Sequence, residues 1–237
     1  MADTRIDSCQ PQRPKTSITS PLKMARALEP SSADHDEDHS QLSHRHMFDK
    51  GFVERHDLEQ YVWTTNTVNA LTKALSYEPK LCCMATPSIA QAFYLEDGRA
   101  VRLLDIDTRF SYLPGFLYWD IRKPEPIMPA GGSNEEELEE EFRVVVFDPP
   151  FFYIPMHELH GAVLQVCRGD FRTKLLIGFL VREEGNLLKT FQEFNLVRTK
   201  FVLEYATVKP NKWRNYALYS NVDLPGIRRL CKQSSRR

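Results

Sequence analysis

The stretch RVVVFDPPF (Arg143–Phe151) joins the most buried-looking strand of the sequence to a rigid turn. A continuous apolar run with a sharp stop is typical of a strand that a parallel sheet buries on both faces. Pro149 and Pro150 end the run, because proline lacks a backbone N–H and fixes its own φ. The stretch therefore predicts a parallel strand with Asp148 at its carboxyl end.

Strand-like and helix-like segments alternate on both sides of this stretch. Helices are expected within residues 57–76, 88–96, 156–167 and 183–194, and strands near positions 81, 101, 116, 143, 174, 200 and 214. Such alternation predicts an α/β protein whose parallel sheet is covered by helices on both faces. Residues 199–208 and 214–221 are both β-prone, with no helix expected between them, and so predict an antiparallel hairpin at one edge.

The composition indicates one ordered domain with two tails. A chain of 237 residues with 42% hydrophobic residues can form one sizeable core. Residues 1–47 are polar, mix Pro, Ser, Asp and His, and show no apolar period, so they are expected to be disordered. The ordered domain is expected over residues 48–228, with an acidic loop insert at 123–141 and a basic tail at 229–237.

Several classes of protein and of site are disfavoured. The chain has no uninterrupted run of 18 apolar residues and begins with a polar stretch, so neither a membrane partner nor a secretory signal is expected. Five cysteines without CxxC spacing favour an intracellular, cytoplasmic or nuclear compartment, and Cys82 and Cys83 look like packing residues of a strand. No metal site is expected, because His157 and His160 are spaced one residue too closely for HExxH.

The net charge of −1 conceals a strong asymmetry. From Arg198 to the C-terminus there are ten Lys or Arg against Glu204 and Asp223, which gives +8 for this part and −9 for the rest. This pattern indicates either an anionic partner near the C-terminal end or a solvated basic tail without a partner. The sequence leaves both open, and it does not fix the oligomeric state.

Polar residues follow four of the predicted strands at the point where each strand ends. Thr86-Pro87-Ser88 follows the first, Asp105 and Asp107 the second, Asp120 the third and Asp148 the fourth. Ligands of open α/β sheets bind beyond these ends, and an acid after the second strand commonly accepts hydrogen bonds from ribose hydroxyls. The first turn lacks GxGxxG, which favours a nucleoside without pyrophosphate, such as S-adenosylmethionine.

The turn Asp148-Pro149-Pro150-Phe151 has the chemistry to hold an amine. An NH2 group could donate one hydrogen to the Asp148 carboxylate and one to the Pro149 carbonyl, which would direct its lone pair towards a methyl donor. Phe151, with Phe152 and Tyr153, could stack on a planar substrate. A lone Asp-Pro-Pro could also merely end a strand and cap a helix. The acids on successive strand ends favour a shared site instead.

DPPF after an apolar strand resembles the probable N6-adenine methyltransferase family. Members have the seven-strand S-adenosylmethionine-dependent methyltransferase fold, a Rossmann-like sheet. They include lysine methyltransferases of elongation factor 1-alpha and the catalytic domain of zinc-finger ribosomal-RNA adenine methyltransferases. The similar stretches span about residues 48–228 and are QYVWTTNT (60–67), LCCMATPSIAQAF (81–93), LLDIDTRF (103–110), FLYWDI (116–121), VVVFDPPFF (144–152) and NYALYSN (215–221).

This resemblance implies a role for each matching position. The cofactor pocket would use Gln60, Trp63, Thr64, Thr86, Pro87, Ser88, Asp105 or Asp107, and Asp120. Asp148 to Phe151 would hold the target amine, and Phe152, Tyr153 and His157 are expected to contact the substrate. The zinc-binding modules of the ribosomal-RNA enzymes are absent from the sequence, so the resemblance does not imply their substrate.

Three functions stay open at this point. The first is N6-adenine methylation of RNA or DNA, which the aromatic run and the basic C-terminal part favour. The second is methylation of a protein lysine, plausibly on elongation factor 1-alpha, where Asp148 would assist loss of the ammonium proton. The third is a non-catalytic binding module, which the intact DPPF turn disfavours.

Overall fold

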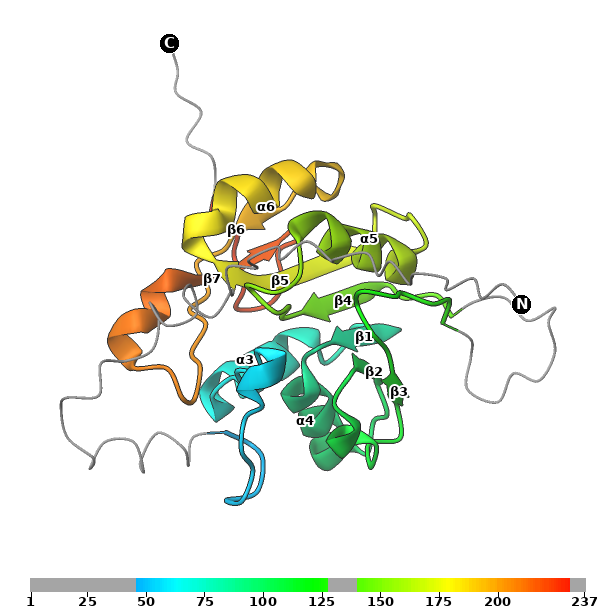
Figure 1. Ribbon diagram of the computed structural model, residues 1–237, viewed down its shortest axis with the longest axis vertical. Coiled ribbons are helices and arrows are strands. Elements are labelled where there is room, and N and C mark those ends of the chain that lie inside the picture. The colour runs from blue at the N-terminus through cyan, green and yellow to red at the C-terminus, as the bar shows by residue number, and fades with distance from the viewer. Residues whose placement is uncertain (1–45, 128–139, 231–237) are drawn as a thin grey trace, which may run out of the picture. The chain divides into compact units, whose positions relative to one another are not determined.

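The computed structural model describes residues 46–127 and 140–230, which include a mixed seven-stranded sheet (Figure 1). Its strands are β1 (Leu81–Met84), β2 (Arg102–Asp105), β3 (Phe116–Tyr118), β4 (Val144–Phe147), β5 (Lys174–Leu180), β6 (Val197–Arg198) and β7 (Tyr216–Ser220). They are arranged in the order β3-β2-β1-β4-β5-β7-β6. β1 to β5 are parallel, and β7 is antiparallel to both β5 and β6. The strand order reverses between β1 and β4, where open sheets bind their ligands.

Helices cover the two faces of this sheet, as predicted. They are α3 (Thr65–Leu75), α4 (Pro87–Asp97), α5 (Met156–Cys167) and α6 (Glu184–Thr190). Val144 and Val146 of β4 belong to one buried cluster with residues of α3 and α4, whereas Val145 and Phe147 belong to a second cluster with residues of α5 and α6. Figure 1 shows these helix pairs on opposite sides of the strands. The uninterrupted apolar run of β4 is thus explained by burial on both faces.

Local signals in the sequence explain where two of the helices begin. Thr64 is the N-cap of α3, since its hydroxyl oxygen accepts a hydrogen bond from the Thr67 backbone N–H at 3.3 Å. Pro87 occupies the first turn of α4, where its missing N–H costs nothing. The helix then ends at Gly98, whose positive φ of 63° suits glycine.

Short 3-10 helices complete the described elements. They are η2 (His56–Leu58), η3 (Thr108–Phe110), η4 (Val181–Glu183), η5 (Gln192–Phe194) and η6 (Pro210–Asn215). The helix predicted over 57–76 begins only at Thr65, because residues 57–63 line a pocket instead. The helix predicted over 183–194 is divided into α6 and η5.

The C-terminal hairpin differs from the prediction in its first strand. β6 and β7 are antiparallel at the edge, as expected, but β6 contains only two residues. The following segment leaves the sheet, and its Tyr205 forms an isolated antiparallel bridge with Trp63. The prediction that no helix connects the two β-prone stretches is also wrong, because the 3-10 helix η6 lies between them.

The predicted domain limits fall largely on residues that the structure does not describe. Residues 1–45, 128–139 and 231–237 lie outside the described ranges, so the tails and most of the acidic insert stay predictions. At the C-terminal end, the Leu230 backbone N–H donates to the Arg198 carbonyl at 2.8 Å, beyond the expected domain limit at 228. None of the helices within the described ranges is long and apolar enough to cross a membrane.

Candidate active site

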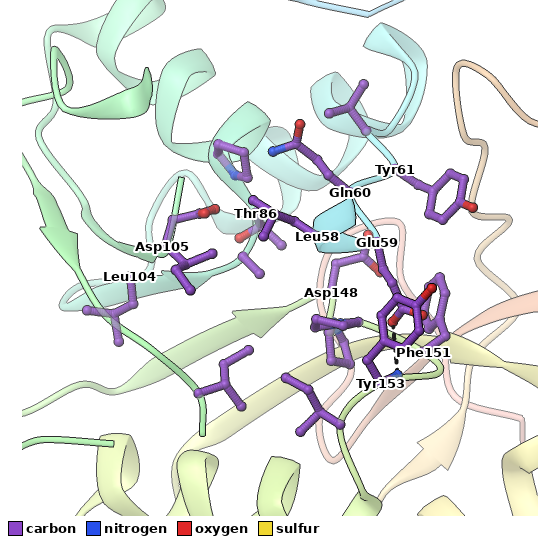
Figure 2. Close-up of a pocket in the computed structure, with 18 of the residues that line it drawn as sticks. Leu58, Glu59, Gln60, Tyr61, Thr86, Leu104, Asp105, Asp148, Phe151 and Tyr153 are labelled. Atoms are coloured by element: carbon purple, nitrogen blue, oxygen red, sulfur yellow. Dashed lines mark hydrogen bonds between the residues drawn. The ribbon is translucent and has the colours of Figure 1, made fainter. Parts of the chain in front are cut away.

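The carboxyl ends of β1, β2 and β4 border a pocket of about 950 Å³, a volume that includes space open to solvent. Most of the predicted site residues line it: Gln60, Trp63, Thr86, Pro87, Ser88, Asp105, Asp120, Asp148, Pro149, Pro150, Phe151 and Tyr153. Figure 2 shows Asp105 and Thr86 on one side, and Asp148, Phe151 and Tyr153 on the other. The pocket therefore has Asp105 on one side and Asp148 on the other, so two different groups of a ligand could be bound.

Asp105 is the carboxylate at the β2 end of the pocket. It is only 8% exposed, and its Oδ1 accepts a hydrogen bond from the Asp107 backbone N–H at 2.8 Å. Burial raises the pKa of Asp105 to about 7. A buried acceptor at this position suits the hydroxyl groups of a ribose, so the structure fits the predicted nucleoside cofactor here.

Asp107, the alternative to Asp105, does not line the pocket. Its side chain is 1% exposed and pairs with the Arg109 guanidinium at 2.7 Å, while Gln60 Nε2 donates to it at 3.0 Å. Burial alone would raise the pKa of Asp107, but the hydrogen bonds from Arg109 and Gln60 bring it below its usual value. Asp107 thus fixes Gln60 and Arg109, and Asp105 is the acid that faces the pocket.

The turn after β1 and the end of β3 complete this half of the pocket. Ala85, which precedes Thr86, has a positive φ of 49°, a strained conformation for a residue with a side chain. Such strain is common where a chain must turn sharply beside a ligand. Asp120, which follows β3, lines the same pocket and is half-buried, and its Oδ1 accepts a hydrogen bond from the Arg122 backbone N–H at 2.9 Å.

Asp148 lies at the other half of the pocket, at the end of β4. Its Oδ1 accepts a hydrogen bond of 2.8 Å from the Tyr205 hydroxyl. The side chain lines the pocket and is partly exposed. Desolvation raises the pKa of Asp148 well above its usual value, and the hydrogen bond from Tyr205 opposes this.

The aromatic residues after Asp148 divide between core and rim. The ring of Phe151 packs edge-on against Phe179, with centroids 5.6 Å apart, and also lines the pocket. Tyr153 lines the pocket and is 43% exposed. Phe152 does not line it but is exposed beside it, with the Arg182 guanidinium 5.4 Å from its ring centroid.

Glu59 is a pocket residue that the sequence did not single out. Its Oε2 accepts hydrogen bonds from the backbone N–H groups of Phe152 at 2.8 Å and Tyr153 at 3.4 Å, directly after the DPPF turn. Its Oε1 is buried and without a partner in the described ranges. Burial raises the pKa of Glu59, against the effect of those two hydrogen bonds. No local pattern predicts this contact, because its partners are distant in sequence.

The remaining predicted residues lie outside the pocket lining. Thr64 is buried, caps α3 and donates to Glu204 Oε2 at 2.9 Å. His157 is exposed in the first turn of α5. No cluster of three or more metal-binding side chains was found in residues 46–127 and 140–230. Cys82 and Cys83 are buried packing residues, as predicted.

A comparison with sequence families identifies the family to which this chain belongs. Residues 54–223 match the sequence family described as "Probable N6-adenine methyltransferase". No curated protein matches the chain. Among solved structures, protein PH1948 of Pyrococcus horikoshii has a TM-score of 0.44 at 16% identity and covers 83% of this chain and 100% of its own.

Two other solved structures are similar at the same level. Thermoplasma acidophilum 1320 has a TM-score of 0.40 at 14% identity, with 73% of this chain and 91% of that one covered. TrmN of Thermus thermophilus has a TM-score of 0.39 at 15% identity, with 69% of this chain and 48% of that one covered. These likenesses say nothing about a substrate.

Proposed function

Because the chain belongs to the probable N6-adenine methyltransferase family, we propose that it transfers a methyl group from S-adenosylmethionine to the N6 amine of adenine in RNA or DNA. The observation that carries this proposal is the position of Asp148. One of its carboxylate oxygens is held by Tyr205, and the side chain lines a pocket whose other half presents Asp105. The two ends of the pocket thus suit a target amine and a nucleoside cofactor.

The cofactor half would be formed by the predicted residues that line the pocket. Asp105 would accept hydrogen bonds from the ribose, and Asp120 would accept one from the adenine amine of the cofactor. The strained turn at Ala85 and Thr86 would lie against the cofactor. The bound cofactor supplies an electrophilic methyl group on a sulfonium, which needs no covalent bond to the protein.

The role of the protein in the transfer is to orient the target nitrogen. The Asp148 carboxylate and the Pro149 carbonyl would each accept one N–H of the amine, so that the nitrogen lone pair points towards the methyl group. The N–C bond forms as the S–C bond breaks, and one N–H proton then leaves the nitrogen for Asp148 or water. Tyr153 and Phe151 would stack on the flat base.

Positive charge beside the pocket supports a nucleic acid as the substrate. Lys212 and Arg214 on η6 are exposed and have no ion pair within the described residues, and η6 contacts η4, which carries Arg182. Phosphate groups on either side of a flipped or unpaired adenine would be attracted to these side chains.

A second candidate is methylation of a protein lysine, for example on elongation factor 1-alpha. The observation that favours it is the buried Oε1 of Glu59, which has no partner among residues 46–127 and 140–230 and belongs to a side chain that lines the same pocket as Asp148. Two carboxylates near aromatic rings such as Tyr61 would suit a cationic side chain.

Transfer of a labelled methyl group separates the two candidates. The protein is mixed with labelled S-adenosylmethionine and, in separate reactions, with RNA, DNA or purified elongation factor 1-alpha. We expect label in nucleic acid that digests to N6-methyladenosine or its deoxy form, and labelling that is about 10²- to 10⁴-fold slower with Asp148→Ala. Label on the elongation factor alone would overturn the nucleic-acid proposal and support the lysine one.

A further inference from the structure

The hydrogen bond between Tyr205 and Asp148 joins the pocket to a segment that the sequence placed in the sheet. Tyr205 is fully buried, and its hydroxyl donates to Asp148 Oδ1 at 2.8 Å. A tyrosine hydroxyl that donates to a carboxylate stabilises the ionised form of that carboxylate. Tyr205 therefore acts on both the direction and the charge of Asp148.

Backbone contacts on both sides hold Tyr205 in place. The Thr64 N–H donates to the Glu204 carbonyl at 2.8 Å, and the Ala206 N–H donates to the Val62 carbonyl at 2.9 Å. The Trp213 indole N–H donates to the carbonyl of Tyr205 itself at 3.1 Å. The hydroxyl is thus presented by a fixed backbone rather than by a loose loop.

Gly178 of β5 provides the space in which this hydrogen bond forms. A Cβ atom at this position would lie 2.5 Å from Asp148 Oδ1 and 3.4 Å from the Trp63 ring. Both distances are at or below van der Waals contact, and the first would force the carboxylate to move. Any side chain at position 178 would therefore push Asp148 away from Tyr205.

We propose that Tyr205 is a positioning residue, which holds Oδ1 of Asp148 in the space left by Gly178 so that Oδ2 faces the substrate amine. This inference rests on the proposed function, because it assigns to Asp148 the role of amine acceptor. The inference assigns a role to Tyr205 and Gly178, neither of which would touch the substrate itself. It also predicts a specific dependence of the reaction on pH.

The pH dependence follows from the groups around Asp148. The titratable side chains that share its pocket are Asp57, Glu59, Tyr61, Asp105, Asp120, Arg122 and Tyr153. Tyr205 contacts Asp148 directly, Tyr216 lies against Tyr205, and Arg182 is near Tyr216. Within the described residues, Tyr205 donates the one side-chain hydrogen bond to Asp148. Loss of its hydroxyl leaves desolvation unopposed, so the carboxylate would ionise at a higher pH, and the acid limb of the pH–rate profile would move the same way.

The test compares Tyr205→Phe with Tyr219→Phe. Tyr219 is a matched control, because it is also fully buried and donates to a carboxylate, Glu184 Oε2, at 3.0 Å, outside the pocket. We expect Tyr205→Phe to lower kcat about 10- to 100-fold at neutral pH and to move the acid limb upwards. The Kd for S-adenosylmethionine should stay within about twofold of the wild-type value. Tyr219→Phe should keep the wild-type pH profile.

A second variant and a direct titration separate this inference from the proposed function. Gly178→Ala keeps the Tyr205 hydroxyl but displaces the carboxylate, so it should lower kcat with a similar shift of the pH profile. The carboxyl carbon of labelled Asp148, followed by NMR in each folded variant, should titrate at higher pH in Tyr205→Phe. A wild-type profile and titration in Tyr205→Phe would overturn the inference. Full activity of Asp148→Ala would instead overturn the proposed function.

Discussion

The carboxylate of Glu59 accepts a hydrogen bond of 2.8 Å from the backbone N–H of Phe152, a residue 93 positions further along the chain. Glu59 itself has a positive φ of 54°, which is uncommon for a residue with a side chain. The contact ties the segment before α3 to the turn after β4, and both line the pocket. The conformation of the DPPF turn is therefore stabilised by the hydrogen bond to Glu59 as well as by the two prolines within the turn.

Glu59→Ala should weaken both folding and methyl transfer. It leaves the N–H groups of Phe152 and Tyr153 without an acceptor, which should cost about 1–3 kcal/mol in the free energy of unfolding. We expect a larger loss in kcat than in cofactor affinity, because the disturbed turn lies at the substrate end. Urea unfolding and steady-state kinetics measure the two effects. The control, Glu96→Ala, removes an exposed glutamate at the end of α4. Equal behaviour of the two variants would contradict the contact.

Asp105 predicts a pH dependence of cofactor binding. Burial raises its pKa to about 7, so the ionised form, the better acceptor for ribose hydroxyls, is present mainly above that pH. The Kd for S-adenosylmethionine should therefore fall from pH 6 to pH 8 in the wild-type protein. Asp105→Asn should bind about 10- to 100-fold more weakly at pH 8 and show little change with pH. Calorimetry at several pH values tests this, with Asp97→Asn as an exposed control.

The same carboxyl group affects stability with the opposite sign. An unfolded Asp titrates near its ordinary pKa of 3.8, so between this pH and about 7 the folded protein binds more protons than the unfolded chain. The contribution of Asp105 to the free energy of unfolding must then decrease as the pH rises through this window. Asp105→Asn without cofactor should be more stable than the wild-type protein at pH 8. A less stable variant at that pH would show that Asp105 is ionised and well compensated.

The basic side chains of η6 should govern binding of a nucleic-acid substrate. Lys212→Glu combined with Arg214→Glu should raise the Kd for single-stranded RNA or DNA and reduce the slope of log K against log salt by about 0.7 per lost phosphate contact. Lys73→Glu with Lys189→Glu changes the net charge equally at exposed positions of α3 and α6. Identical salt slopes for both double variants would contradict a phosphate-binding role of η6.

Two glycines should respond to alanine in opposite ways. At Gly115 an added Cβ would lie 1.8 Å from the Val101 carbonyl oxygen, so Gly115→Ala must displace the β2–β3 backbone and lower the free energy of unfolding. At Gly161, in the middle of α5, nothing lies within 4 Å of the added atom. Gly161→Ala should therefore stabilise the protein by about 0.5–1 kcal/mol. Thermal or urea unfolding decides both signs.

The sequence predicted the centre of the fold well because the signals there are local. Continuous apolar runs identify β4 and β5, and helical periodicity identifies α5 with the bounds that the structure shows. The edge strand β6 was placed wrongly, because the β-prone residues after Arg198 pack beside Trp63 and α3 instead of pairing in the sheet. Alternation of apolar residues indicates a half-buried segment but not its partner.

The sequence predicted many of the residues that line the pocket but not the contacts among them. Asp105 and Asp107 have the same side chain and lie two positions apart in the sequence. Only the fold shows that Asp105 faces the pocket and that Asp107 pairs with Arg109. Glu59 and Tyr205 were missed, since their partners lie 93 and 57 positions away. Contacts at such separations leave no spacing pattern in a single sequence.

The rate of methyl transfer by Asp148→Ala, measured in a single turnover at saturating S-adenosylmethionine, tests most directly whether this carboxylate holds the target amine. The account predicts a folded variant with wild-type cofactor affinity and a transfer rate lower by about 10²- to 10⁴-fold. A rate within about twofold of the wild-type value would show that the nitrogen is held elsewhere, and would contradict the account.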